Sequence, residues 1–138
     1  MKYVININQK AIVDLGLQGK VDFIDLAIYD FVTEFMLCDE CVNIQIADTK
    51  YFWIKPELII ENLPLLGITT SRGINKRIGN LVECGLLERC KDNQSLHQSF
   101  YKVGVNYKAY KFFTWNENSK GAWNENSNNN NSIPNTKD

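Results

Sequence analysis

The sequence predicts an α+β fold in which a three-helix core carries a small β-hairpin. Three observations between Gly67 and Val103 support this prediction. A polar segment precedes an amphipathic stretch of helical period, and a Gly-Leu-Leu sequence ends that stretch. Two short apolar stretches around a polar turn then predict a hairpin. This order of elements places one exposed helix beside one hairpin.

The chain has 138 residues, which is enough for one domain with a core and too few for two ordinary domains. Its 44% hydrophobic and 22% charged residues are typical of a soluble globular protein. No apolar run approaches the roughly 18 residues of a membrane span, and the N-terminus lacks the features of a signal peptide. We therefore expect a cytoplasmic protein without a membrane contact. It divides into an N-terminal arm (1–20), a domain (21–113) and a tail (114–138).

The spacing of apolar residues predicts the first two elements. Residues 3–17 alternate loosely and predict a short strand or an extended arm, with a turn near Gly16 and Gly19. Residues 21–37 have the period of a helix with a broad apolar face. This face is larger than a small three-helix core needs, so we expect the helix and the arm to form a homodimer contact. The acidic residues of this helix are expected to stay in water: Asp22, Asp25, Asp30 and Glu34.

A hairpin and a short helix are predicted next. An alternating apolar stretch at 42–46 and an aromatic stretch at 51–54 form the hairpin. Pro56 suits the first position of the following helix. Because a proline in a helix interior costs about 3 kcal/mol, Pro64 predicts that this helix ends or kinks near Asn62.

The helix at 69–84 has the clearest sequence pattern. It follows a turn at 66–68, and Thr69 or Thr70 is expected to cap its first backbone amides. Gly85 is expected to end it in a left-handed conformation. Its apolar residues recur at spacings of four, seven and eight, which places them on one side of the helix: Ile74, Ile78, Leu81 and Val82.

After this helix the chain divides into a hairpin and a tail. The hairpin strands are expected at 86–91 and 99–104, around a polar tip at 92–95. The pentapeptide WNENS then occurs twice and is followed by four asparagines. Such a sequence buries too little apolar surface to offset the entropy of ordering, so we expect disorder in 114–138.

The cysteines and the single histidine give little support for catalysis. Cys38 and Cys41 form a C-x-x-C, whereas Cys84 and Cys90 are more widely spaced. A zinc site prefers two tight pairs, so we interpret all four as reduced structural thiols, with a metal site as the weaker alternative. The sequence has no phosphate loop, no nucleophile elbow and no suggestive carboxylate pair. We predict a protein that is not an enzyme and needs no cofactor or metal.

Charge is distributed unevenly along the chain. The whole chain has a net charge of −1. Residues 1–68 contain five Lys or Arg against ten Asp or Glu, whereas residues 69–111 contain eight against three. This asymmetry indicates one basic face on an acidic body, which suits a nucleic-acid partner. It would also suit a self-complementary oligomer.

The apolar side of the helix at 69–84 determines which residues face away from it. At ~100° per residue, the opposite face includes basic and amide side chains of the kinds that read purine edges in a major groove. Gly79 on this face leaves room for a phosphate or a sugar. A solvated basic face is the alternative interpretation. The candidate DNA-contacting residues on this helix and on the hairpin are Ser71, Arg72, Asn75, Lys76, Arg77, Asn80, Lys91, Gln94 and Lys102.

With these residues in place, the chain resembles the winged helix-turn-helix superfamily of bacterial and phage DNA-binding domains. More narrowly, it is similar to the N-terminal domains of phage and plasmid replication organisers. The resemblance is carried by the helix with Ile74, Ile78 and Leu81, by the exit at 85–87 and by the return strand at 100–103. The aromatic stretch Tyr51–Ile54 fits as well.

This resemblance implies a non-enzymatic protein that binds double-stranded DNA, usually as a dimer, with the helix at 69–84 as its recognition helix. The function would be transcriptional regulation or accessory work in replication. Two features depart from the pattern, the acidic overall charge and the presence of Glu83 on the exposed face. The alternative function is a protein-interaction module built on the same fold.

Overall fold

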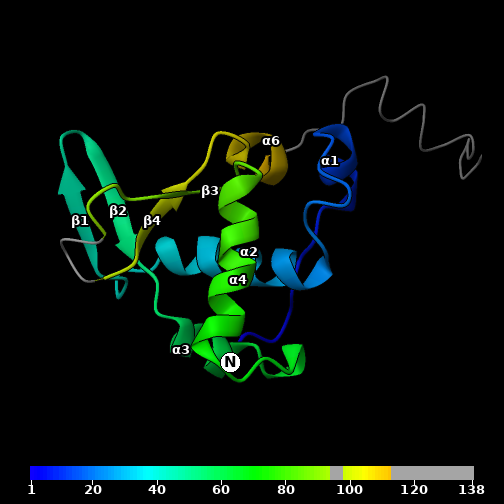
Figure 1. The fold of residues 1–138 in the computed structure, drawn as a ribbon, viewed down its shortest axis with the longest axis horizontal. Helices are drawn as coiled ribbons and strands as arrows, with labels where there is room; N and C mark the ends of the chain where they lie inside the picture. The colour runs from blue at the N-terminus through cyan, green and yellow to red at the C-terminus, as the bar shows by residue number, and fades with distance from the viewer. Residues whose placement is uncertain (94–97, 113–138) are drawn as a thin grey trace, which may run out of the picture.

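The computed structural model describes residues 1–93 and 98–112, and in these residues it has an α+β fold (Figure 1). Helix α4 runs across α2 in Figure 1, and the β-strands lie to one side of both helices. Gln94 and the predicted disordered tail at 114–138 lie outside the described residues. The elements in chain order are α1 (Gln9–Asp14), α2 (Phe23–Met36), β1 (Asn43–Ile46), β2 (Thr49–Trp53), α3 (Pro56–Asn62), the 3-10 helix η1 (Pro64–Leu66), α4 (Ser71–Glu83), β3 (Leu87–Arg89), β4 (Phe100–Val103) and α6 (Tyr107–Lys111).

The four strands form one antiparallel sheet in the order β1-β2-β4-β3. Both predicted hairpins are confirmed, β1 with β2 and β3 with β4. Pairing of Phe52 with Tyr101 joins the two hairpins, which the sequence pattern did not predict. Tyr101, Leu87 and Phe52 pack on the helical core, so one face of the sheet covers the helices.

Helix α2 is the centre of the core. Asp22 caps it, accepting a hydrogen bond from the backbone N–H of Asp25. The expectation that all its acidic residues stay in water is correct for Asp22 and Glu34 and wrong for Asp25 and Asp30, which are 1% and 4% exposed. Both buried carboxylates have cationic partners from other elements, which sequence spacing along α2 does not reveal.

The broad apolar face of α2 is covered by its own chain. Leu26, Ile28, Tyr29, Phe31 and Val32 are all buried in one cluster with residues of α1, α3, α4 and α6. The size of this face is therefore no longer a reason to expect a dimer contact there. The predicted homodimer through α2 and the arm stays a prediction.

The first 20 residues differ from the expected strand or extended arm, because residues 9–14 form helix α1. The side chain of Asn8 caps this helix by accepting a hydrogen bond from the Ala11 N–H. Ala11, Ile12 and Leu17 belong to the same core as the rest of the protein. Six residues are too few for helical and strand periods to be told apart, which explains the error. The turn at Gly16 and Gly19 is confirmed, each with positive φ.

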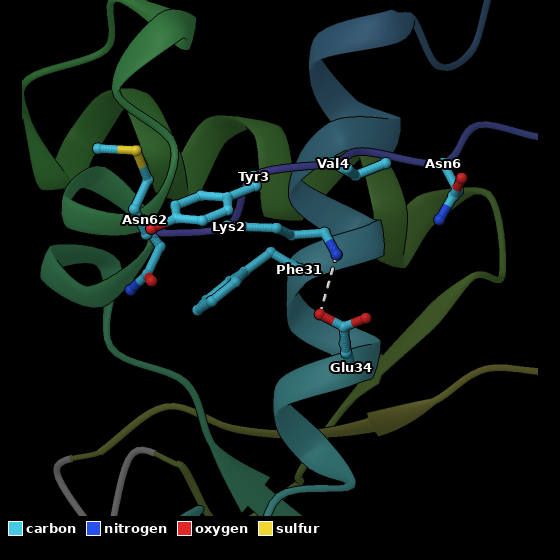
Figure 2. Close-up of a pocket in the computed structure, with 8 residues that line it drawn as sticks. Lys2, Tyr3, Val4, Asn6, Phe31, Glu34 and Asn62 are labelled. Atoms are coloured by element: carbon cyan, nitrogen blue, oxygen red, sulfur yellow. Dashed lines mark hydrogen bonds and ion pairs between the residues drawn. The ribbon is translucent and has the colours of Figure 1, made fainter.

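The segment before α1 lies along α2 and is held by polar contacts. The Lys2 ammonium lies 2.8 Å from Glu34 and 3.2 Å from Asp30, and Figure 2 shows Lys2 reaching across to Glu34. The backbone N–H of Asn6 donates to the same Asp30 carboxylate, and Lys111 of α6 lies 3.3 Å from it. An open pocket of about 420 Å³ lies between this segment, Phe31 and neighbouring residues.

The segment from α3 to α4 follows the predicted local rules. Helix α3 begins at Pro56 and ends at Asn62, as Pro64 predicts. Gly67 then has a φ of 71° in the turn, and Thr70 is the cap of α4. Gly85 follows α4 with a φ of 83°, the predicted left-handed conformation.

The four cysteines differ in their exposure to solvent. Cys38 is exposed, whereas Cys41, Cys84 and Cys90 are buried, and all four are free thiols. Burial, with a smaller contribution from Cys38, raises the pKa of Cys41 to about 11, which keeps this thiol protonated at neutral pH.

Among residues 1–93 and 98–112, no helix has the length and apolar character needed to cross a bilayer.

Candidate nucleic-acid interface

Helix α4 has a fixed rotation about its own axis. The Thr70 hydroxyl accepts a hydrogen bond from the Gly73 N–H at 3.1 Å and fixes its start. Ile74, Ile78 and Leu81 are at most 1% exposed and pack in the core with α2 and α3. Burying each of these side chains is worth roughly 1.5–3 kcal/mol, so a rotated helix would be strongly disfavoured.

The opposite edge of α4 carries exposed donors. Arg72, Asn75 and Lys76 are exposed, and within the described part of the chain neither Arg72 nor Lys76 forms an ion pair. Figure 1 shows α4 on the outer side of α2, with no other element in front of it. The three residues lie in the N-terminal half of the helix, and we call them the α4 edge. This edge can donate hydrogen bonds to an approaching polyanion.

Gly79 lies beside the α4 edge, and a Cβ added to it would have no atom within 4 Å. Gly79→Ala is therefore expected to stabilise the protein by about 0.5–1 kcal/mol, because glycine is a poor helix former. Gly79→Glu should also fold, but it should weaken duplex binding by about 1 kcal/mol or more through charge repulsion. Thermal unfolding and duplex titration measure the two effects. Gly79→Gln separates size from charge, and unchanged affinity of the Glu variant would contradict the placement of DNA here.

Arg77 and Asn80 face a different direction from the α4 edge. The Arg77 guanidinium lies 2.6 Å from Asp22 and 3.3 Å from Asp25. The Asn80 amide donates to the Asp25 carboxylate at 3.3 Å. These four residues, which we call the α2–α4 brace, connect the start of α2 to the middle of α4. Two of the predicted DNA-contacting residues are thus engaged within the protein.

The α2–α4 brace shifts the pKa values of its two carboxyl groups in opposite directions. Burial alone would raise the pKa of Asp22, but hydrogen bonds from the Asp25 backbone and from Arg77 hold it below its ordinary value. Burial raises the pKa of Asp25 and outweighs the hydrogen bonds that it accepts. The pKa of Arg77 is raised, chiefly by its hydrogen bond to Asp22. The exposed member, Asp22, therefore contributes the favourable charge, and the buried one is costly to ionise.

Asp22→Asn should lower stability at pH 7 by about 0.5–1 kcal/mol, because asparagine still caps α2 but cannot pair with Arg77. A lowered pKa contributes stability that is present above 3.8 and is lost as the pH falls through the pKa of the folded state. The difference between wild type and variant should therefore shrink between pH 7 and pH 3 in urea unfolding. Asp14→Asn, which removes an exposed pair with Lys10, is the control. Equal differences at both pH values would contradict this assignment.

The remaining predicted DNA-contacting residues differ in their exposure and in their contacts within the protein. Ser71 is half-buried and donates to Glu57 at 3.3 Å, and a carboxylate there disfavours a phosphate at the start of α4. On the β3–β4 hairpin, Lys91 is exposed and Lys102 lies 3.7 Å from Glu88. The sequence reasoning omitted Arg89, an exposed cation on β3 whose guanidinium lies 5.9 Å from the Tyr101 ring centre. Strand alternation gave no signal for it, because Arg89 shares a face of β3 with the buried Leu87.

Comparison of the chain with protein-family models, with curated protein sequences and with solved structures finds no match in any of the three. In the described ranges 1–93 and 98–112, no group of three or more His, Cys, Asp or Glu side chains is placed to hold a metal ion.

Proposed function

We propose that the protein binds double-stranded DNA without enzymatic activity, and that the α4 edge enters the major groove. The observation that carries this proposal is the set of three exposed donors, Arg72, Asn75 and Lys76, opposite a fully buried apolar stripe. Arginine, lysine and asparagine are the side chains that pair with guanine and adenine edges. The buried stripe holds them in a fixed direction, as base readout requires.

In this proposal the fold is a winged helix-turn-helix. Helices α3 and α4, with the turn at Gly67 between them, form the helix-turn-helix, and the β3–β4 hairpin is the wing. Lys91 and Lys102 are the wing residues that meet the DNA backbone. Arg77 and Asn80 hold α4 in position through the brace and are not assigned to base contacts.

The biological role under this proposal is transcriptional regulation or an accessory role in replication, and the protein acts in the cytoplasm. A protein-interaction module is the second candidate. It is favoured by large apolar side chains in exposed positions: Phe23 at 63%, Leu37 at 80% and Leu65 at 97% exposure. The salt dependence of binding distinguishes the two functions. The affinity of an apolar contact changes little with salt, whereas phosphate contacts release counterions and weaken as salt is added.

Fluorescence anisotropy with a labelled random-sequence duplex tests the proposal when it is titrated over several salt concentrations. Contacts to about four phosphates predict a slope of log K against log salt near −3 to −4. Selection from a random duplex library at low salt covers the case of strict sequence specificity. Failure of both the titration and the selection would overturn the proposal in favour of a protein partner.

A further inference from the structure

The two outer strands of the sheet differ in how their edges are protected. Among the described residues, β1 and β3 are the outer strands. Strand β3 has only three residues, and two of them, Glu88 and Arg89, are charged. Strand β1, Asn43–Ile46, has no charged residue and no proline. Natural sheets usually protect an edge with charges, prolines or bulges, so β1 has the features of an edge that pairs.

The register of the β1–β2 hairpin shows which backbone groups of β1 remain open. The Trp53 N–H donates to the Val42 carbonyl at 2.8 Å. Because bonded and non-bonded pairs alternate along antiparallel strands, Ile44 and Ile46 also bond to β2. The N–H and C=O groups of Asn43 and Gln45 therefore point away from β2, toward the open edge.

The side chains of β1 add an apolar surface to this edge. Ile44 pairs with Tyr51, and residues opposite each other on antiparallel strands share a face. This face lies away from the helices, because Phe52 on the opposite face packs on the core. Ile44, Ile46 and Tyr51 are all half-buried, so part of their apolar surface is still in contact with water.

We propose that β1 pairs antiparallel with β1 of a second copy of this chain, with the two-fold axis at Gln45. In this register the open groups of Gln45 bond to those of Gln45 in the other copy. Ile44 of each copy then lies opposite Ile46 of the other copy, which gives two isoleucine pairs. A register centred on Ile44 would instead place Ile46 opposite Val42, which lies outside β1, so the pairing of all four isoleucines favours the first register.

A second copy suits this edge because an uncharged strand is complementary to itself, whereas the charged β3 offers a poor match. Two four-residue strands and four isoleucines bury less than the roughly 1,200–2,000 Å² of a stable interface. The dimer is therefore weak and forms as concentration rises. It uses a surface different from α2 and the arm, and it does not depend on DNA binding, although it would place two α4 helices in one assembly.

Sedimentation equilibrium of the full chain under reducing conditions, from about 10 to 500 µM, tests the pairing. The wild type should change from monomer toward dimer over this range. Gln45→Lys and Gln45→Glu each place like charges on the two-fold axis and should each raise the dimer Kd by about tenfold or more. An equimolar mixture of the two variants should restore association, since Lys then faces Glu.

Gln45 is exposed and makes no backbone bond to β2, so both variants should keep the circular dichroism spectrum of the wild type. Gln45 lies opposite Lys50 within its own hairpin, so Gln45→Lys should melt slightly below the wild type and Gln45→Glu slightly above it. Gln18→Lys is the matched control at an exposed glutamine outside the sheet, and it should leave association unchanged. A wild type that stays monomeric, or a dimer equally strong in both variants, would overturn the pairing. Failure of the mixture to recover would overturn the two-fold register.

Discussion

Replacement of both Arg72 and Lys76 by alanine is expected to weaken duplex binding by about 2–6 kcal/mol, since each contact is worth about 1–3 kcal/mol. Both side chains are exposed and lack ion-pair partners in the described chain, so they contribute their full charge to a polyanion. If both meet phosphates, the slope of log K against log salt should become less negative by about 2. Anisotropy titrations at three salt concentrations measure both quantities.

The folded state should be unaffected, because neither side chain is buried and neither forms an ion pair with another described residue. Lys10→Ala with Lys50→Ala is the matched control, since it also removes two exposed positive charges but from α1 and β2. This control should lose much less affinity. Equal affinity of the wild type and the α4 variant would refute the assignment of α4 as the recognition helix. Equal losses in both double variants would show a non-specific effect of net charge.

Gly104→Ala is expected to destabilise the protein by about 3 kcal/mol or more. A Cβ at Gly104 would lie 2.2 Å from the carbonyl oxygen of Gly85 and 3.0 Å from the carbonyl carbon of Leu86. Both are backbone atoms that cannot rotate away. The same segment is fixed by hydrogen bonds, from the Gly104 N–H to Leu86 and from the Asn106 N–H to Gly85, each at 2.9 Å. The junction between the end of β4 and the end of α4 must therefore open to admit a methyl group.

Urea unfolding compares this variant with Gly16→Ala. Gly16 has a φ of +72° but no atom within 4 Å of an added Cβ, so alanine there should cost only the roughly 1–2 kcal/mol of left-handed strain. Gly104 is not in a left-handed conformation, so its loss of stability comes from the steric contact, whereas the loss at Gly16 comes from backbone strain. A Gly104 variant within 1 kcal/mol of wild type would show that the α4–β4 junction yields easily.

The elements that the sequence predicted well are those controlled by local rules. Thr70 and Gly85 bound α4 through capping chemistry, and Pro64 limits α3 because it cannot continue a helix. The joining of β2 to β4 was not predicted, since it depends on strands about fifty residues apart for which no local signal exists. Helix α1 was missed because its packing, not its period, stabilises it.

The same distinction applies to the candidate interface. Helical period alone was enough to place Arg72, Asn75 and Lys76 on the exposed edge of α4. It did not reveal that Arg77 and Asn80 contact Asp25, because their acceptor comes from another helix and is itself buried. A carboxylate one turn into a helix, followed far along the chain by an arginine, has no distinctive spacing.

Asp30 has a consequence for how the protein opens. Its carboxylate contacts Lys2 near the start of the described chain and Lys111 near its end. The segments around Lys2 and Lys111 are thereby joined through one carboxylate without a covalent bond, and release of either segment leaves a buried anion with one cation fewer. In most domains the ends fray independently and at little cost in free energy. Here the two segments share one buried anion, so once either has detached, release of the other would leave Asp30 without a cationic partner among the described residues and should cost more than the first release.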